Sequence, residues 1–128
     1  MKKITLVFKG VNTKQDLEIN ERITKELLSL GYNFKLKGTL YLLESIKYIL
    51  NSKNINLLEN LEKNVYQYIA NKNGKKTLNI KTSIIKATNY VYNYQDERIL
   101  NEYFSIKIKI TPKLVISTIL NKLKIIEL

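Results

Sequence analysis

The spacing of hydrophobic residues along the chain predicts a mainly α-helical protein with about six helices. Apolar residues recur every three or four positions, the period of an amphipathic helix. The predicted helices cover residues 20–30, 38–50, 56–70, 78–94, 99–104 and 112–123. Cap residues support several of these boundaries. Gly31 closes the first helix, Asn56 opens the third, and Thr111 followed by Pro112 opens the last.

Two short segments instead alternate between apolar and polar residues, the pattern of a β-strand. They are KITLVF at residues 3–8 and SIKIKI at residues 105–110. Because a lone strand leaves backbone donors and acceptors unpaired, we expect the two to pair as a small two-stranded β-ribbon with Lys107 and Lys109 in solvent. Pairing between two chains would make a homodimer. The alternative is a plain N-terminal extension and an extended connector.

The length of 128 residues suits one domain with its own hydrophobic core. We expect a single domain over residues 1–128, with a strand extension at 1–19 and a helical domain at 20–124. No apolar run is long enough to cross a membrane, and the residues after Met1 do not form a signal-peptide core. The chain has no Cys and therefore no disulfide framework, so a cytoplasmic location is expected.

The composition argues against an enzyme. There is no His and no Cys, so the usual general base, thiol nucleophile and soft metal ligands are absent. The glycines stand apart from one another, which excludes a glycine-rich phosphate loop. Glu59 and Glu62 lie one helical turn apart, but a solvated helix face explains them. We therefore expect no catalytic residues, no cofactor and no metal site.

The charge points to a polyanionic partner. The formal net charge is +11, and 20 of the 22 basic residues are Lys. Such a surplus favours nucleic acid or an anionic membrane. AT-rich codons would also enrich Lys, yet the distribution is uneven: from Lys63 to Gln95 there are six Lys and no acidic residue. The pattern predicts a basic face.

The third and fourth predicted helices outline a helix-turn-helix, because the polar connection NKNGKK at residues 71–76 contains a glycine. At 100° per residue, a core stripe forms on one side of the fourth helix: Ile80, Ile84, Ala87 and Val91. The opposite side and its flanks carry Asn79, Lys81, Thr82, Ile85, Lys86, Asn89 and Asn93. Amides pair with adenine edges, Lys with guanine or phosphate, and aliphatic groups with the thymine methyl. An ordinary amphipathic surface helix is the alternative.

Several segments resemble, in order, the DNA-binding effector domain of stage 0 sporulation protein A, a response regulator of endospore-forming bacteria. LKGTLYLLESI at residues 36–46 is similar to the lysine-glycine-x-x-tyrosine-leucine segment that opens the family's second helix. Weaker similarities lie at residues 23–31, 65–70, 80–87, 101–104 and 111–123. The resemblance covers residues 20–124 and implies an all-helical fold that binds double-stranded DNA.

The chain departs from the family in its recognition helix. The family's helix is rich in arginines that bind guanines, whereas the matching positions here are Asn79, Thr82 and Ile85. The resemblance implies that the fold carries over. Because Lys does not reproduce the planar bidentate fork of arginine, we do not expect the chain to share the family's target DNA sequence. The family's receiver domain has no counterpart in this sequence, and regulation by phosphorylation is therefore not implied.

Three functions remain open. The first is a sequence-specific DNA-binding regulator, or a plasmid or phage accessory protein of the same kind. The second is a protein-interaction module that modulates a full-length sporulation-type regulator, and the third is a nonspecific nucleic-acid binder. For the first, we expect base contacts from Asn79, Lys81, Thr82, Ile85, Lys86 and Asn89. Phosphate contacts are expected from Lys35, Lys37, Lys75 and Lys76, which stand at loop-to-helix entries.

Overall fold

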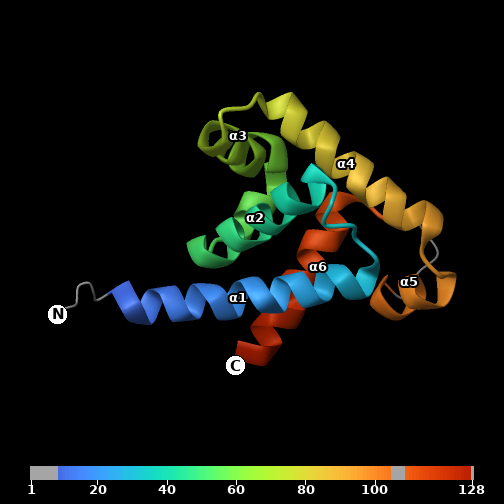
Figure 1. The fold of residues 1–128 in the computed structure, drawn as a ribbon, viewed down its shortest axis with the longest axis horizontal. Coiled ribbons are helices and arrows are strands. Elements are labelled where there is room, and N and C mark those ends of the chain that lie inside the picture. The colour runs from blue at the N-terminus through green and yellow to red at the C-terminus, as the bar shows by residue number, and fades with distance from the viewer. Residues whose placement is uncertain (1–8, 105–108, 128) are drawn as a thin grey trace.

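The computed structural model describes residues 9–104 and 109–127 and confirms the mainly helical fold (Figure 1). The elements, in chain order, are α1 (Lys9–Leu30), α2 (Lys37–Ser52), the 3₁₀ segment η1 (Ile55–Asn60), the π-helical turn η2 (Glu62–Tyr66), α3 (Gln67–Asn73), α4 (Thr77–Tyr94), α5 (Glu97–Phe104) and α6 (Pro112–Glu127). These described residues include no β-strand.

Helix α2 is the centre of the packing, since it contacts α1, α3, α4 and α6. In Figure 1, α4 forms one edge of the molecule and α1 runs along the opposite side, with α2 between them. The largest fully buried side chains come from α1, α2, α3, α4 and α6 and join in one core: Ile23, Leu27, Leu30, Leu42, Ile46, Ile69, Ile80, Ile84, Ile116, Ile119, Leu120 and Leu123.

Helix α1 begins well before residue 20, where the hydrophobic pattern placed its start. It already includes Lys9, so the expected extended segment up to residue 19 is wrong from residue 9 onward. Of the apolar residues just before position 20 whose burial is described, Leu17 is exposed and Ile19 only half-buried, so no core stripe marked an earlier start. The predicted C-cap is confirmed. Gly31 has a φ of 103°, and the amides of Gly31 and Tyr32 both donate to the carbonyl oxygen of Leu27.

The single helix predicted over residues 56–70 is wrong, because the chain there passes from η1 through η2 into α3. The cap is Asn54 instead of Asn56: its side-chain oxygen accepts a hydrogen bond from the Asn56 amide at 3.1 Å. A π-helical turn holds more residues than an α-helical turn, and so changes which positions face inward. This lets Val65 and Tyr66 enter the core together with the residues of α3 that follow.

The predicted start of α6 is confirmed. The Thr111 hydroxyl accepts a hydrogen bond from the Leu114 amide at 3.2 Å, and Pro112 is the first helical residue. The predicted β-ribbon falls largely on residues 3–8 and 105–108, which lie outside the described residues. Of its other residues, Ile110 is buried and Lys109 is exposed, and neither belongs to a strand. Pairing of the two segments stays a prediction.

Candidate nucleic-acid interface

A tight turn of three residues, Gly74 to Lys76, joins α3 to α4. Gly74 adopts the left-handed conformation with a φ of 64°, and the Lys75 amide donates back to the carbonyl oxygen of Ala70 at 2.9 Å. A Cβ on Gly74 would meet no atom within 4 Å, so the backbone angle and not crowding favours glycine here. Lys75 and Lys76 are both exposed on this turn.

The start of α4 keeps its first amide groups available. Lys76 precedes the helix in an extended conformation, and no side chain caps the helix. The amides of Asn79 and Ile80 donate to the Lys76 carbonyl, whereas those of Thr77 and Leu78 lie ahead of the helical hydrogen-bond ladder. These amide dipoles and the two turn lysines make a locally positive surface.

The two faces of α4 match the predicted division. Ile80, Ile84, Ala87 and Val91 are at most 1% exposed, which confirms the core stripe. Of the proposed base-contact residues, Lys81 and Asn89 are half-buried, and the others are exposed: Asn79, Thr82, Ile85 and Lys86. The structure therefore brings the amides, the hydroxyl, the ammonium group and one aliphatic side chain onto one solvent-facing side of a single 18-residue helix.

A buried polar pair fixes the rotation of α4, and the pattern of apolar residues did not reveal it. Thr88 is 1% exposed, and its hydroxyl lies 2.8 Å from the hydroxyl of Tyr32 in the loop after α1. Burial of the Tyr32 phenol raises its pKa above the usual value. Thr88 falls in the same angular sector as Ile84 and Val91, so its position was the available signal.

The crossing of α2 and α4 depends on Gly38, the glycine of the lysine-glycine segment. A Cβ on Gly38 would overlap the carbonyl group of Ser83 in α4, so only glycine allows this close approach. The loop before α2 is also fixed, since the Lys35 amide donates to the Asn33 side chain at 2.9 Å and the Thr39 hydroxyl donates to the Asn33 carbonyl at 2.7 Å.

This crossing positions two more of the predicted phosphate-binding lysines. Lys35 and Lys37 are exposed on either side of Leu36, immediately before Gly38. Since Gly38 abuts Ser83, the backbone that carries these two lysines lies beside the middle of α4. Lys75 and Lys76 lie at the start of the same helix.

Lys81 differs from the other predicted contact residues, because it forms an ion pair. Its Nζ lies 3.0 Å from Oε1 of Glu62, the first residue of η2. The sequence predicts a solvated helix face at Glu62, and nothing in it indicates a partner for this side chain on α4. The pair joins side chains 19 positions apart, so no local pattern signals it.

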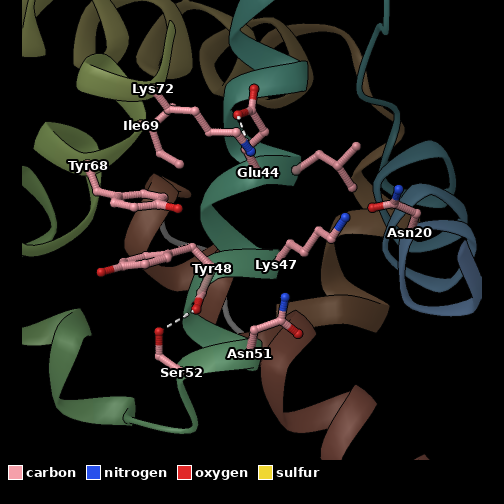
Figure 2. Close-up of a pocket in the computed structure, with 10 residues that line it drawn as sticks. Asn20, Glu44, Lys47, Tyr48, Asn51, Ser52, Tyr68, Ile69 and Lys72 are labelled. Carbon is pink, nitrogen blue, oxygen red and sulfur yellow. Dashed lines mark hydrogen bonds and ion pairs between the residues drawn. The ribbon is translucent and has the colours of Figure 1, made fainter. Parts of the chain in front are cut away.

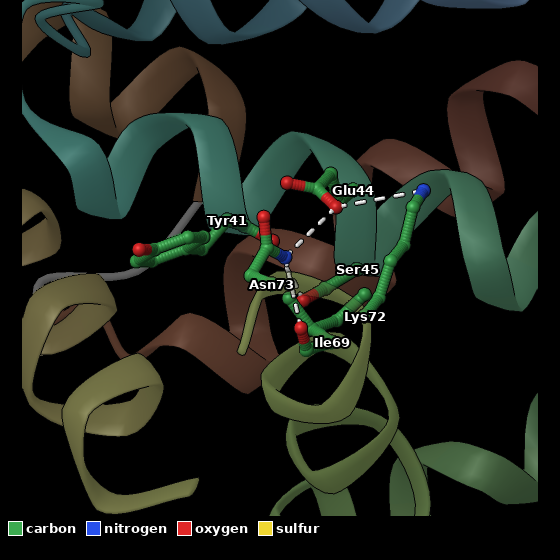
Figure 3. A network of polar contacts seen from close by, with 6 residues as sticks. All are labelled: Tyr41, Glu44, Ser45, Ile69, Lys72 and Asn73. Carbon is green, nitrogen blue, oxygen red and sulfur yellow. Dashed lines mark hydrogen bonds and ion pairs between the residues drawn. The ribbon is translucent and has the colours of Figure 1, made fainter. Parts of the chain in front are cut away.

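A second polar network holds the end of α3 against α2 (Figure 3). The Asn73 side-chain amide donates to the Glu44 carboxylate at 3.3 Å and to the Ile69 carbonyl at 2.8 Å. Lys72 lies 3.7 Å from the same carboxylate. The network anchors the last turn of α3, directly before Gly74, and so helps to fix the turn that leads into α4.

A groove of about 380 Å³ lies between α2 and α3, with Asn20 of α1 at its border (Figure 2). The rings of Tyr48 and Tyr68 stack on one side, with centroids 4.0 Å apart and an interplanar angle of 12°. Lys47 lines the groove beside Tyr48. None of the residues that we predicted to contact DNA lines it, so the groove and the outer face of α4 are separate surfaces.

Comparison with known proteins finds a family match over most of the sequence. The family model described as the C terminal of sporulation initiation factor Spo0A matches residues 23–124. A search of curated proteins finds no match. Across residues 9–104 and 109–127, no helix is long and apolar enough to span a membrane. The Spo0A C-terminal domain is a DNA-binding effector domain. The match covers most of the sequence, and the chain therefore belongs to the Spo0A C-terminal domain family.

Proposed function

We propose that the chain binds double-stranded DNA in a sequence-specific way, with α3, the turn and α4 acting as a helix-turn-helix. The observation that carries this proposal is the outer face of α4, which is exposed and free of acidic residues while the inner face is locked in the core. Figure 1 shows α4 along an edge of the molecule, where a DNA groove has access to it.

The side chains of this face have the groups that distinguish base pairs in the major groove. Asn79 and Asn89 can each pair with the N6 and N7 groups of adenine, and Lys86 can donate to guanine or to phosphate. Ile85 and the Thr82 methyl group suit the methyl group of thymine. Because α4 contains no arginine, we propose a target different from the guanine-containing sites that arginine-rich helices prefer.

Four lysines would hold the DNA backbone on both sides of these base contacts. Lys75 and Lys76 stand at the uncapped start of α4, and Lys35 and Lys37 stand beside its middle. A phosphate at the start of α4 would also meet the free amides of the first turn. Backbone contacts of this kind set the register of the helix in the groove but do not read sequence.

We propose that this binding serves transcription regulation, as the family membership suggests. The charge distribution supports a nucleic-acid ligand, because α4 and the turn before it carry four lysines and no acidic residue. A protein-interaction role and charge-driven binding without sequence preference are the competing functions.

Selection from random duplex DNA tests the proposal. The protein should enrich a defined sequence, and its complex with the enriched duplex should survive excess random competitor. A charge-driven binder would enrich nothing and lose affinity on all duplexes with a similarly steep dependence on salt. A protein-interaction module would bind neither duplex in 50 mM salt. Either of the last two results would refute the proposal.

A further inference from the structure

We propose that Glu62 sets the selectivity of the DNA-binding surface by lowering its affinity for DNA of arbitrary sequence. This inference rests on the proposed function of α4. Glu62 acts by engaging Lys81, a cation at the flank of the outer face, and by placing a carboxylate next to the start of α4.

The contact itself is direct and accessible. Lys81 Nζ and Glu62 Oε1 are 3.0 Å apart, and the two side chains are 42% and 53% exposed. An ion pair this exposed adds little to folding stability, because solvent screens it and both side chains lose rotamer freedom. The main effect of the ion pair is therefore to reduce the positive charge that the surface presents to a ligand. With Glu62 present, Lys81 contributes little net attraction to a nearby phosphate.

The position of Glu62 strengthens this effect. Together with Asn60, Lys63, Gln67 and Thr77, it lines a hollow of about 420 Å³. Thr77 is the first residue of α4, so the hollow borders the same helix start where Lys75 and Lys76 would receive a phosphate. A carboxylate in this hollow repels a DNA backbone that follows the surface from the turn toward η2.

The repulsion discriminates between DNA sequences because the two kinds of complex depend on phosphate contacts to different extents. A complex with random DNA depends almost entirely on neutralised phosphates, whereas a complex with the preferred site adds base contacts. The proposed base contacts come from Asn79 and Asn89, whereas Glu62 pairs with Lys81. Removing the carboxylate should therefore strengthen random binding more than specific binding.

The test compares Glu62→Gln with Glu59→Gln, a matched change of charge one turn earlier in η1. Glu59 is exposed and does not line the hollow. On random duplex DNA at 0.1 M salt, Glu62→Gln should raise the affinity about five-fold and steepen the slope of log affinity against log salt by about 0.9. The ratio of affinities for the selected and random duplexes should fall. Glu59→Gln should change both quantities much less.

A double-mutant cycle identifies Lys81 as the cation involved. In the native background, Lys81→Gln should lower affinity for random DNA less than in the Glu62→Gln background, since Glu62 already engages that lysine. In the Glu62→Gln background, the same change should remove most of the gain. Equal gains from Glu62→Gln and Glu59→Gln, or the same loss from Lys81→Gln in both backgrounds, would overturn the inference while leaving the proposed function intact. Absence of DNA binding by the native protein would overturn both.

Discussion

Gly38 shows how one missing side-chain atom positions the proposed recognition helix. Its Cα faces the carbonyl group of Ser83, and this contact sets how closely α2 and α4 cross. The exposed lysines before Gly38 and the outer face of α4 are both placed by the same crossing. A buried glycine thus decides where the side chains that we propose to contact DNA stand.

We expect Gly38→Ala to destabilise the protein by about 3 kcal/mol, because the new methyl group forces α2 and α4 apart in a packed region. Urea unfolding measures this loss. Gly74→Ala is the matched control: its methyl group has open space, and only the left-handed backbone angle costs about 1 kcal/mol. A larger loss at Gly74 than at Gly38 would contradict this account of the helix crossing.

The Tyr32–Thr88 pair gives a prediction with a pH signature. Tyr32→Phe should cost about 1 kcal/mol at pH 7, because the buried Thr88 hydroxyl loses its partner. Burial raises the folded-state pKa of Tyr32 above the unfolded value of about 10. The phenol's stabilising contribution is therefore complete below pH 10 and declines as the pH rises further.

The variant lacks this titration, so the difference in unfolding free energy between native protein and Tyr32→Phe should shrink above pH 10. Urea unfolding at pH 9 and at pH 11 measures the difference directly. If the two proteins lost stability in parallel over this range, Tyr32 would not be a buried titrating phenol.

Helix α4 combines two roles in 18 residues. Its inner side supplies core residues and the Thr88 hydrogen bond, which fix its rotation. Its outer side is then presented in one orientation, with the turn lysines at one end. Because the two roles lie on opposite faces, substitutions on the outer face should change DNA binding without unfolding the protein.

Asn89→Ala should weaken binding to the selected duplex by about 1–3 kcal/mol and change binding to random DNA much less. The physical reason is the loss of paired hydrogen bonds to a base, which only the preferred sequence supplies. Asn51→Ala is the control, because Asn51 lines the separate groove beside α2. Fluorescence anisotropy on both duplexes checks the result. Equal weakening on the two duplexes would place Asn89 among backbone-contacting residues.

Replacement of the turn lysines should behave differently from replacement of Asn89. Lys75→Gln or Lys76→Gln should lower affinity for all duplexes by a similar factor and reduce the salt slope by about 1. Lys113→Gln makes the same charge change at an exposed position in the first turn of α6 and serves as the control. Salt titration of binding measures the slope. Slopes unchanged in both turn variants would place the DNA on another face.

Beyond the single hydrophobic core, a cluster of polar contacts, which we call the latch, connects α1 with α5 and α6. The Tyr103 hydroxyl of α5 donates to the Glu26 carboxylate of α1 at 2.9 Å, and Lys122 of α6 donates to the same carboxylate at 3.0 Å. Lys122 also lies 4.1 Å from the centre of the Tyr103 ring. The latch joins α1, near the start of the chain, to α5 and α6, near its end.

Tyr103→Phe should reduce stability by about 0.5–1.5 kcal/mol, because it deletes one hydrogen bond of the latch while Lys122 keeps its contact with Glu26. The change alters no charge. DNA affinity and salt slope should therefore stay at native values, while thermal unfolding shifts to lower temperature. A changed salt slope would show that the latch is coupled to the DNA-binding surface.

The sequence determined the features that depend on local spacing. Apolar residues at helical intervals predicted α2 as a helix and located the core stripe of α4, because each face of a helix repeats every three or four residues. In α2 the apolar spacing did not identify the buried face, since Leu40 is exposed whereas Leu42 is fully buried. The caps at Gly31 and Thr111 were predictable because capping uses only neighbouring backbone groups. The exposed face of α4 followed from the same periodicity, and the family resemblance was visible in the segment around Gly38.

The tertiary structure alone decided the features that depend on distant partners. The π-helical turn before α3 arises where Val65 and Tyr66 enter a core whose other residues come from other helices. The Glu62–Lys81 pair joins groups that no periodic pattern links, and whether a surface lysine is paired or available depends on that contact. Gly38 was visible as a motif, but its physical reason is the backbone of another helix pressed against it. The spacing of apolar residues in the sequence indicates which face of a helix a side chain lies on. Only the packing of the helices shows which groups that side chain contacts.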